Sequence, residues 1–253
     1  MKKNILSVFQ EKKPIIGVIH CKGDTDADVL ERAKREIDIY RTGGVDGVLV
    51  ETYFGTYHNV EQVLGYLQKE QTGYPYGVNC LNVDAMGFVL AQEFGCDYLQ
   101  IDSVGGHLKS RDDETLDAFF KYFREKCDAY LMGGVRFKYQ PVNSGRSTEE
   151  DLKICMNRCD AICVTEDATG QETSMKKIEQ FRNAIGKFPL IVCAGMTAEN
   201  VEEQLKVADA GVVGSYFKDT YKDTGDVSAE HVKNFMERVR ILRDKINDQI
   251  SSG

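Results

Sequence analysis

The sequence predicts an α/β fold in which eight strand–helix units close into one barrel. Short runs rich in β-branched residues recur at intervals of roughly 30 residues, and stretches with helical apolar spacing separate them. The runs are apolar throughout, which is typical of parallel strands covered on both faces. Eight such units in 253 residues match the size of a (β/α)8 TIM barrel.

Eight apolar runs mark the predicted strands. They are IIGVIHC from Ile15, GVLVETY from Gly47, YGVNCLN from Tyr76, YLQIDS from Tyr98, YLMGGVRF from Tyr130, AICVTE from Ala161, PLIVCAG from Pro189 and AGVVGS from Ala210. The alternative, an open doubly wound sheet, usually has fewer strands and a G-x-G-x-x-G turn after the first. Here the first run continues as His20-Cys21-Lys22-Gly23-Asp24, which favours the barrel.

Amphipathic segments between the runs are the predicted helices. They span residues 27–42, 59–69, 85–94, 113–126, 148–158, 174–185, 198–205 and 229–246. Side chains that can cap a helix precede several of them, including Ser147, Thr173-Ser174 and Thr197. No Pro-rich or Gly/Ser-rich linker interrupts the chain, so we expect one domain over residues 1–253. The irregular stretch DTYKDTGD, residues 219–226, predicts a mobile loop after the last strand.

Composition excludes several classes of protein. The formal net charge is −8, whereas a protein that binds nucleic acid or an anionic membrane should carry a basic surface. No apolar run approaches the roughly 20 residues that a transmembrane helix needs. Hydrophobic residues make up 42% of the chain, enough for a sizeable core. We therefore expect a cytoplasmic protein without a nucleic-acid partner or a transmembrane segment.

The eight cysteines indicate a core of reduced thiols. Cys21, Cys80, Cys163 and Cys193 lie inside apolar runs, where cysteine acts as a small hydrophobe. Cys155, Cys159 and Cys163 lack the C-x-x-C spacing of zinc sites. We predict no metal site and no cofactor, although the sequence leaves room for a divalent cation.

Candidate catalytic groups follow from the barrel, because reacting groups in this fold come from the C-terminal ends of the strands. Glu51, Asp102 and Glu166 end the second, fourth and sixth runs, so all three carboxylates could surround one mouth. Carboxylates brought together raise each other's pKa and one can then act as a general acid or base. Lys138 supplies a cation after the fifth run. The alternative is that these charged residues only form a salt-bridge network and take no part in catalysis.

Other polar strand ends are candidates for binding substrate. These are His20, Asn79, Thr165, Thr169 and Gly170. Buried polar groups need partners, so each should face a wet cavity or a hydrogen-bonded network. The alternative is that the Asn and Thr residues only cap loops and that His20 is a packed core histidine.

The loops after the seventh and eighth runs predict a phosphate site. AGMTAENV and GVVGS place glycines before helix starts, where backbone amides and the helix dipole can hold an anion. The candidates are Gly195, Met196, Asn200, Gly214 and Ser215. Barrels often bind phosphate in these two loops. The alternative is that the glycines only permit tight turns.

Six stretches resemble the BtpA/SgcQ family of TIM-barrel proteins. They are IIGVIH, GVDGVLVE, YGVNCL with Asp84 beyond it, CDAICVT with the later TG, GMTAENV, and ADAGVVGSYFK. The resemblance runs from Ile15 to about Arg240. It places Glu51, Asn79, Lys138, Thr165, Thr169, Gly170, Gly195, Asn200, Gly214 and Lys218 on the family's motif positions. The resemblance implies a role in photosystem assembly or in sugar metabolism.

Four departures from the family pattern cluster at the predicted mouth. Cys21-Lys22-Gly23-Asp24 stands where the family has a Pro-rich loop, and Asn82-Val83 where it has Arg-Asn. Tyr139 replaces the family's His, and Glu166 replaces its Gly. We therefore expect a substrate different from that of closer relatives.

Two functions remain open from the sequence. The first is an isomerase, lyase or hydrolase that acts on a small phosphorylated metabolite, a sugar phosphate or a nucleotide-like molecule, by acid–base chemistry. The second is a non-catalytic assembly or binding protein that keeps the barrel as a scaffold. Barrels often associate through their outer helices, so the sequence also leaves open whether the protein forms a homo-oligomer.

Overall fold

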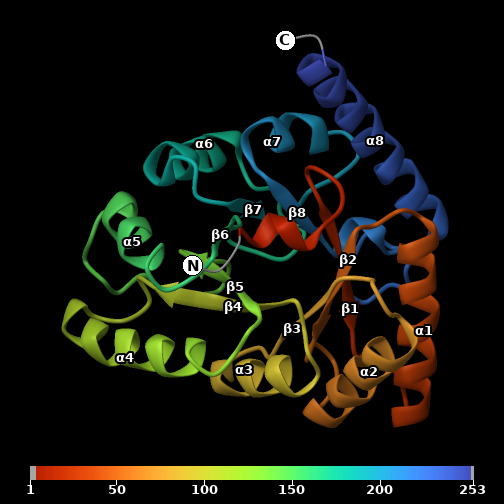
Figure 1. The fold of residues 1–253 in the computed structure, drawn as a ribbon, viewed down its shortest axis with the longest axis horizontal. Coiled ribbons are helices and arrows are strands. Elements are labelled where there is room, and N and C mark those ends of the chain that lie inside the picture. The colour runs from red at the N-terminus through yellow and green to blue at the C-terminus, as the bar shows by residue number, and fades with distance from the viewer. Residues whose placement is uncertain (1–3, 252–253) are drawn as a thin grey trace.

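The computed structural model describes residues 4–251 and shows eight parallel strands in a closed barrel surrounded by helices (Figure 1). The first three and last two residues of the predicted domain lie outside the described residues. Each strand pairs with the next along the chain, and β8 closes on β1 with Ile15 opposite Gly211. The predicted (β/α)8 barrel is confirmed.

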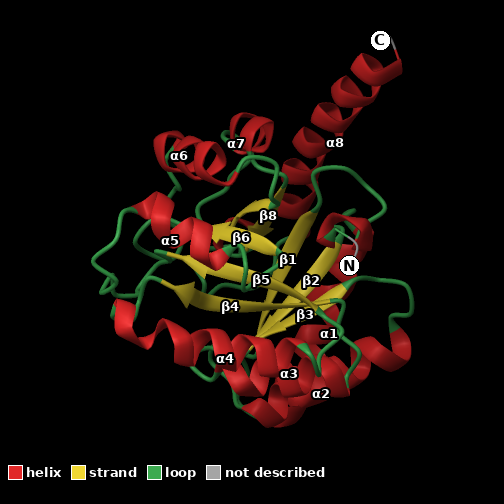
Figure 2. Cartoon of the chain, turned by 60° about the vertical axis from the view of Figure 1, so that its left-hand side comes forward, coloured by secondary structure: helices red, strands yellow, loops and turns green. Residues whose placement is uncertain are grey.

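The strands and helices alternate along the chain. The strands are β1 (Ile15–His20), β2 (Gly47–Glu51), β3 (Tyr76–Asn79), β4 (Tyr98–Gly105), β5 (Tyr130–Val135), β6 (Ala161–Val164), β7 (Leu190–Val192) and β8 (Ala210–Val213). The helices are α1 (Asp26–Thr42), α2 (Tyr57–Glu70), α3 (Asp84–Glu93), α4 (Asp113–Arg124), α5 (Thr148–Cys155), α6 (Met175–Ile185), α7 (Val201–Val207) and α8 (Ala229–Ser251). Figure 2 shows the helices outside the strands.

Most strands begin where the apolar runs predict, and two strands differ for local reasons. β7 begins at Leu190 because Pro189 has no N–H for the ladder, although its carbonyl accepts from Ile162 N at 2.8 Å. β4 continues beyond the predicted run to Gly105, with an irregular register between Ile101 and Gly105. That irregularity bends the strand at the barrel mouth.

The helix caps fit the predicted starts at two helices and differ at a third. Ser147 forms a capping box with Glu150, and Ser174 accepts from Lys177 N at 3.4 Å. α7 begins at Val201 rather than near residue 198, because Thr197 N donates to Asn200 Oδ1 at 2.8 Å in a separate turn. This turn belongs to the loop that approaches the mouth.

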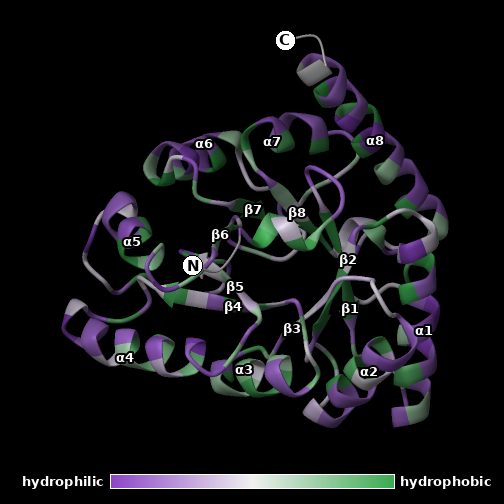
Figure 3. Ribbon diagram, viewed as in Figure 1, coloured by the Kyte–Doolittle hydropathy of each residue, from purple (hydrophilic) through white to green (hydrophobic). Residues whose placement is uncertain are grey.

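The core has two layers, one between strands and helices and one inside the barrel. The inner layer contains alternate residues of the strands, such as Ile16 and Val18 of β1 and Ile191 of β7, with Cys193 just after β7. In Figure 3 the strands are mainly hydrophobic, whereas the helices carry hydrophilic residues on their outer surfaces. Side chains therefore fill the barrel, and open space is confined to its ends.

The N-terminal segment closes one end of the barrel. Its short 3-10 helix (Ile5–Val8) lies across the barrel centre in Figure 1. Ile5 and Phe9 are buried, and the Phe9 ring lies 5.7 Å from that of Tyr98 inside the barrel. A ligand must therefore enter from the opposite end, where the strands finish.

No helix in the described part of the chain is long and apolar enough to cross a membrane.

Candidate active site

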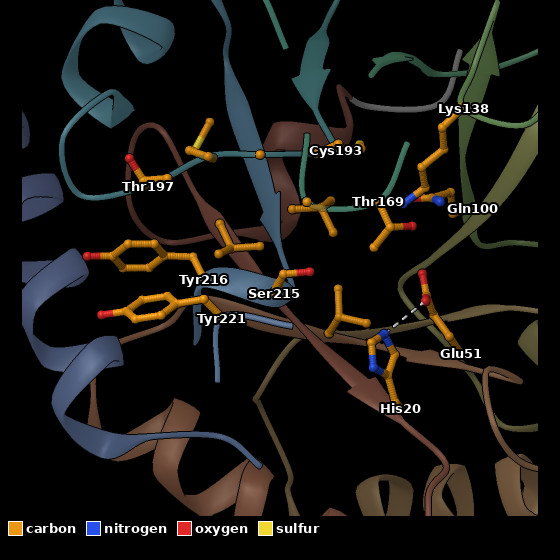
Figure 4. Close-up of a pocket in the computed structure, with 18 of the residues that line it drawn as sticks. His20, Glu51, Gln100, Lys138, Thr169, Cys193, Thr197, Ser215, Tyr216 and Tyr221 are labelled. Carbon is orange, nitrogen blue, oxygen red and sulfur yellow. Dashed lines mark ion pairs between the residues drawn. The ribbon is translucent and has the colours of Figure 1, made fainter. Parts of the chain in front are cut away.

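A cavity of about 420 Å³ lies at the C-terminal end of the barrel. Many of the predicted site residues line it: His20, Glu51, Lys138, Thr169, Gly170, Gly195, Met196, Gly214 and Ser215. In Figure 4, His20, Glu51 and Lys138 lie at one side, and Tyr216 and Tyr221 lie at the other. The cavity therefore has an ionisable side and a side formed by the last two loops.

His20 and Glu51 face each other from neighbouring strands. They are register partners at the ends of β1 and β2, with His20 Nε2 3.5 Å from Glu51 Oε2. His20 Nδ1 lies 3.0 Å from the carbonyl oxygen of Asp223. A carbonyl oxygen only accepts, so Nδ1 donates and Nε2 is left to face Glu51 and the cavity.

Glu51 is held in its ionised form. Burial on its own raises the pKa of this carboxyl, but hydrogen bonding and charge attraction from His20, together with Lys138 and Asn79, bring the pKa below its usual range. At neutral pH the carboxylate is therefore a proton acceptor at the cavity wall.

Asp102 lies behind the cavity wall and accepts hydrogen bonds from two side-chain amides. Its Oδ1 accepts from Asn79 Nδ2 at 3.1 Å and from Gln100 Nε2 at 3.2 Å. Burial and the charge of Glu51 raise the pKa of Asp102, while the two amides oppose that rise. Asp102 and Asn79 thus lie next to the cavity and contact residues that line it.

Lys138 reaches the cavity from the loop after β5. Its main-chain N–H donates to Thr165 Oγ1 at 2.7 Å, which ties this loop to the end of β6. Arg136 and Tyr139 on either side have φ angles of +48° and +61°. These left-handed residues turn the chain so that the Lys138 side chain points inward, as Figure 4 shows. Thr165 itself is fully buried and holds the loop.

The loop after β7 needs glycine at one position. Gly195 has a φ of +66°, and a Cβ there would lie 2.2 Å from the carbonyl oxygen of Gln171. Asn200 donates to the Gly195 carbonyl at 3.0 Å and accepts from Thr197 N. Asn200 therefore braces the loop from outside the cavity, whereas Gly195 and Met196 form its wall.

The loops after β6 and β8 complete that wall. Gly170 lies close to Ser215, since a Cβ on Gly170 would be 3.5 Å from Ser215 Oγ. Gly214 precedes a short 3-10 helix (Ser215–Phe217), whose first amides have no acceptor within the helix. Backbone edges and hydroxyl groups thus surround this side of the cavity.

Glu166 lies outside the cavity. Its Oε2 accepts from Ser174 N at 3.1 Å and from Ser174 Oγ at 3.3 Å, next to the start of α6. It lines a separate surface hollow between the loops after β5 and β6. The three predicted carboxylates therefore do not meet in one mouth, and Glu51 alone among them lines the cavity.

Several lining residues were missed from the sequence: Gln100, Thr197, Glu199, Tyr216 and Tyr221. The alternation of side chains along β4 could have predicted that Gln100 points into the barrel. Tyr98 packs inside the barrel, so Gln100 and Asp102 share its direction. Thr165 follows the end of β6, is fully buried and does not line the cavity, and Glu166 beyond it bonds to Ser174 outside the cavity. Tyr221 had no such signal, because it belongs to an irregular loop.

The described residues contain no group of three or more His, Cys, Asp or Glu side chains that could hold a metal ion.

The fold and the cavity define the chain as a TIM-barrel protein whose candidate site occupies the usual position of active sites in this fold. The chain belongs to the BtpA family, whose model matches residues 11–241. The predicted resemblance to this family is confirmed.

Relatives match nearly the full length of the chain. An uncharacterized protein of Thermococcus kodakarensis is 26% identical over 92% of this chain and 97% of its own. The photosystem I biogenesis protein BtpA of Synechocystis is 24% identical over 85% of this chain and 84% of its own. The sgc region protein SgcQ of Escherichia coli is 24% identical over 93% of this chain and 97% of its own.

Solved structures share the fold at low identity. The (S)-3-O-geranylgeranylglyceryl phosphate synthase of Thermoplasma acidophilum, in complex with sn-glycerol-1-phosphate, has a TM-score of 0.62 at 11% identity, covering 94% of this chain and 97% of its own. The thiamine phosphate pyrophosphorylase of Pyrococcus furiosus has a TM-score of 0.61 at 11% identity, covering 91% and 96%. These similarities establish the barrel and do not transfer an activity.

Proposed function

We propose that this protein is an enzyme that isomerises or cleaves a small phosphorylated metabolite by acid–base chemistry at the barrel mouth. One observation carries the proposal. An ionised Glu51 and the Lys138 side chain share one cavity with the glycine-containing loops after β6, β7 and β8. One side of the cavity therefore suits proton transfer, and the other suits an anionic group.

Glu51 is the proposed general base. It is ionised at neutral pH and lies at the cavity wall with His20 beside it. Lys138 is the proposed electrostatic partner, whose ammonium group stabilises negative charge on the substrate after the proton leaves. This division fits an isomerase or a lyase, and a hydrolase in which Glu51 deprotonates water.

The last loops are the proposed phosphoryl site. Gly195, Gly214 and Ser215 line the cavity together with Lys138, and Figure 4 shows Ser215 apart from the Lys138 side chain. Two structural neighbours support a phosphorylated ligand by name, since one is a thiamine phosphate pyrophosphorylase and the other was solved in complex with sn-glycerol-1-phosphate.

A thermal-shift screen tests the proposal. The probes are inorganic phosphate, triose, pentose and hexose phosphates, and nucleoside monophosphates. A ligand at 100 times its Kd should stabilise the fold by about 2.7 kcal/mol. We expect a selective rise in Tm with one class of phosphorylated metabolite.

A charge variant locates the phosphoryl group. Ser215→Asp places a negative charge where we expect the phosphoryl oxygens, so it should abolish the shift. Ser7→Asp makes the same change on an exposed serine in the segment that closes the other end of the barrel, and it should keep the shift. Gly195→Asp is unsuitable, because its Cβ would collide with Gln171.

A cooperatively melting protein that responds to no phosphorylated probe would overturn the proposal. The non-catalytic assembly or binding role would then be the better account. Isolation of a stable protein partner, with no ligand bound in the cavity, would support that role.

A further inference from the structure

Tyr221 forms an exposed aromatic surface at the cavity wall. Of the three exposed tyrosines in the described part of the chain, Tyr122, Tyr139 and Tyr221, only Tyr221 lines the cavity. Its ring stacks on that of His231 in α8, with the centroids 4.3 Å apart and an interplanar angle of 13°. His231 covers one face of the tyrosine ring, whereas 55% of the surface of Tyr221 stays exposed. The uncovered ring surface is therefore available for a ligand to stack on.

The protein's own hydrogen bonds hold this aromatic platform, Tyr221 with His231 behind it. The main-chain N–H of Tyr221 donates to the carbonyl oxygen of Lys218 at 3.0 Å, and His231 Nδ1 donates to the same oxygen at 2.9 Å. Lys218 is fully buried, and its ammonium group is paired with Glu36. The platform is therefore preorganised, which lowers the entropy cost of ordering its side chains when a ligand binds.

The backbone of Tyr221 is unfavourable for a bulky residue. Its φ of +56° lies in the left-handed region, which residues other than glycine rarely adopt. Burial in the core does not offset this cost, because most of the residue is exposed. Tyr139 shares the conformation, but its hydroxyl oxygen accepts from Thr169 N at 2.9 Å and so joins two loops. Strain of this kind concentrates at ligand-binding sites, which favours a binding role for the Tyr221 ring.

The chemistry of the platform suits a planar ring. The face of an aromatic ring stacks with other flat rings and offers no hydrogen-bond donor, whereas the hydroxyl groups of a sugar need polar partners. The ionisable side chains of His20, Glu51 and Lys138 lie at the other side of the cavity in Figure 4. A nucleobase therefore fits the platform better than a sugar does, because every base has a flat face that stacks on an aromatic side chain.

Two neighbouring groups fit the rest of a nucleotide. The Tyr216 ring lies 5.5 Å from that of Tyr221, and burial and the charge of Glu199 raise the pKa of Tyr216. Glu199 lines the cavity, so its carboxylate can accept hydrogen bonds from N–H groups at the edge of a base. Ser215, in the proposed phosphoryl site, directly precedes Tyr216 in the chain. The platform and the phosphoryl site therefore belong to one stretch of the cavity wall, as the base and the phosphate of one nucleotide require.

We propose that the Tyr221 ring stacks on a nucleobase, so that the phosphorylated substrate is a nucleotide. This inference rests on the proposed function and names the substrate class of the same site. The phosphoryl group binds the loops after β7 and β8, the base lies on the platform, and Glu199 accepts from the edge of the base. Glu51 and Lys138 keep the acid–base roles proposed above.

Calorimetric titration of four proteins tests the inference. Wild type, Tyr221→Phe, Tyr221→Leu and Tyr122→Leu are each titrated with inorganic phosphate, ribose 5-phosphate, AMP, GMP, CMP and UMP. Ribose 5-phosphate is the matched ligand, because it keeps the sugar and the phosphate of a nucleotide and lacks the base. Tyr122→Leu is the matched control, because it removes an exposed tyrosine from α4, outside the cavity. Cooperative melting of each variant shows that the fold is retained.

We expect wild type to bind at least one of the four nucleotides about tenfold more tightly than ribose 5-phosphate, since stacking of a base on an aromatic side chain contributes about that factor. Tyr221→Leu should abolish this preference and leave the affinity for ribose 5-phosphate within about twofold, because removing the base and removing the ring delete the same contact. Tyr221→Phe should keep the preference, because it keeps the ring, and Tyr122→Leu should keep it as well.

Three results would contradict the inference alone. Equal affinity of wild type for ribose 5-phosphate and all four nucleotides would mean that no base is recognised, and the proposed function would still stand. A nucleotide preference that survives in Tyr221→Leu would place the base elsewhere in the cavity. If Tyr221→Leu loses as much affinity for ribose 5-phosphate as for the nucleotide, the ring contacts the sugar or only shapes the cavity. If wild type binds none of the probes, the proposed function fails, and this inference fails with it.

Discussion

His20 Nδ1 donates a hydrogen bond of 3.0 Å to the main-chain carbonyl of Asp223, a residue 203 positions later in the chain. This contact requires a proton on Nδ1 and turns Nε2 toward Glu51. The loop that carries Asp223, residues 219–226, is the one that the sequence predicts to be mobile. In the structure it is attached to α1, since Arg32 donates to the Gly225 carbonyl at 2.7 Å and pairs with Asp226 at 2.5 Å.

Removing Arg32 should release this loop. Arg32→Leu deletes the contacts to Gly225 and Asp226, so we expect faster amide hydrogen exchange in residues 219–226 and a change in the His20 ring NMR shifts. Arg35→Leu, an exposed position on the same helix, is the control and should leave both unchanged. Unaltered exchange in Arg32→Leu would show that other contacts hold the loop.

Loss of Glu51 should remove turnover while the fold remains. On a substrate identified by the screen, we expect Glu51→Gln to lower kcat by about 10²–10⁴-fold, since it keeps the shape but removes the base. Lys138→Ala should lower kcat by about 10²-fold or more through lost charge stabilisation. Glu114→Gln, an exposed carboxylate on α4, is the control. Full turnover in both cavity variants would refute these assignments.

The buried pair of Lys218 and Glu36 should respond unequally to removal of its two partners. Lys218 Nζ lies 3.0 Å from Glu36 Oε2 and is fully buried, whereas Glu36 also accepts from Arg32 Nε at 3.1 Å. Glu36→Gln leaves an ammonium group without a countercharge and should cost about 3 kcal/mol. Lys218→Met leaves Glu36 paired with Arg32 and should cost about half of that. Urea denaturation measures both, and the reverse order would contradict the prediction.

Asp84 should make stability depend on pH. Burial, with the charge of Asp102, raises the pKa of Asp84 to about 6 from an ordinary value of 3.8. The folded state therefore binds the proton more tightly than the unfolded chain. Protonated Asp84 therefore adds to the free energy of unfolding. This stabilisation is fully present below about pH 4 and is lost as the pH rises through 6.

Asp84→Asn removes this dependence. We expect the variant to exceed wild type in unfolding free energy by about 1–2 kcal/mol at pH 7.5, allowing for solvent screening, and to match it near pH 4. Urea denaturation of both proteins across this range measures the difference. A constant difference between the two proteins at every pH would mean that Asp84 does not titrate as described.

The fold was predictable because its signals are local. Each strand is a short β-branched run, and each cap lies next to its helix, as at Ser147 and Ser174. The errors have local causes as well. Pro189 cannot donate to the ladder, and the turn at Thr197 replaces the first turn of α7.

The candidate site was predictable only in part. The rule that strand ends surround the mouth brought His20, Glu51 and Lys138 to one cavity. The rule does not say which way a side chain points, so it also selected Thr165 and Glu166, neither of which lines the cavity. It also omits positions inside a strand, which is why Gln100 was missed.

The sequence by itself determined the barrel, the order of its strands and the family, because apolar periodicity and motif spacing are properties of neighbouring residues. The tertiary structure decided which predicted groups meet. The contact between His20 and Asp223 joins distant parts of the chain, and Asp102 accepts hydrogen bonds from both Asn79 on β3 and Gln100 on β4. Such contacts depend on how loops and side chains pack in three dimensions, which spacing along the chain does not encode.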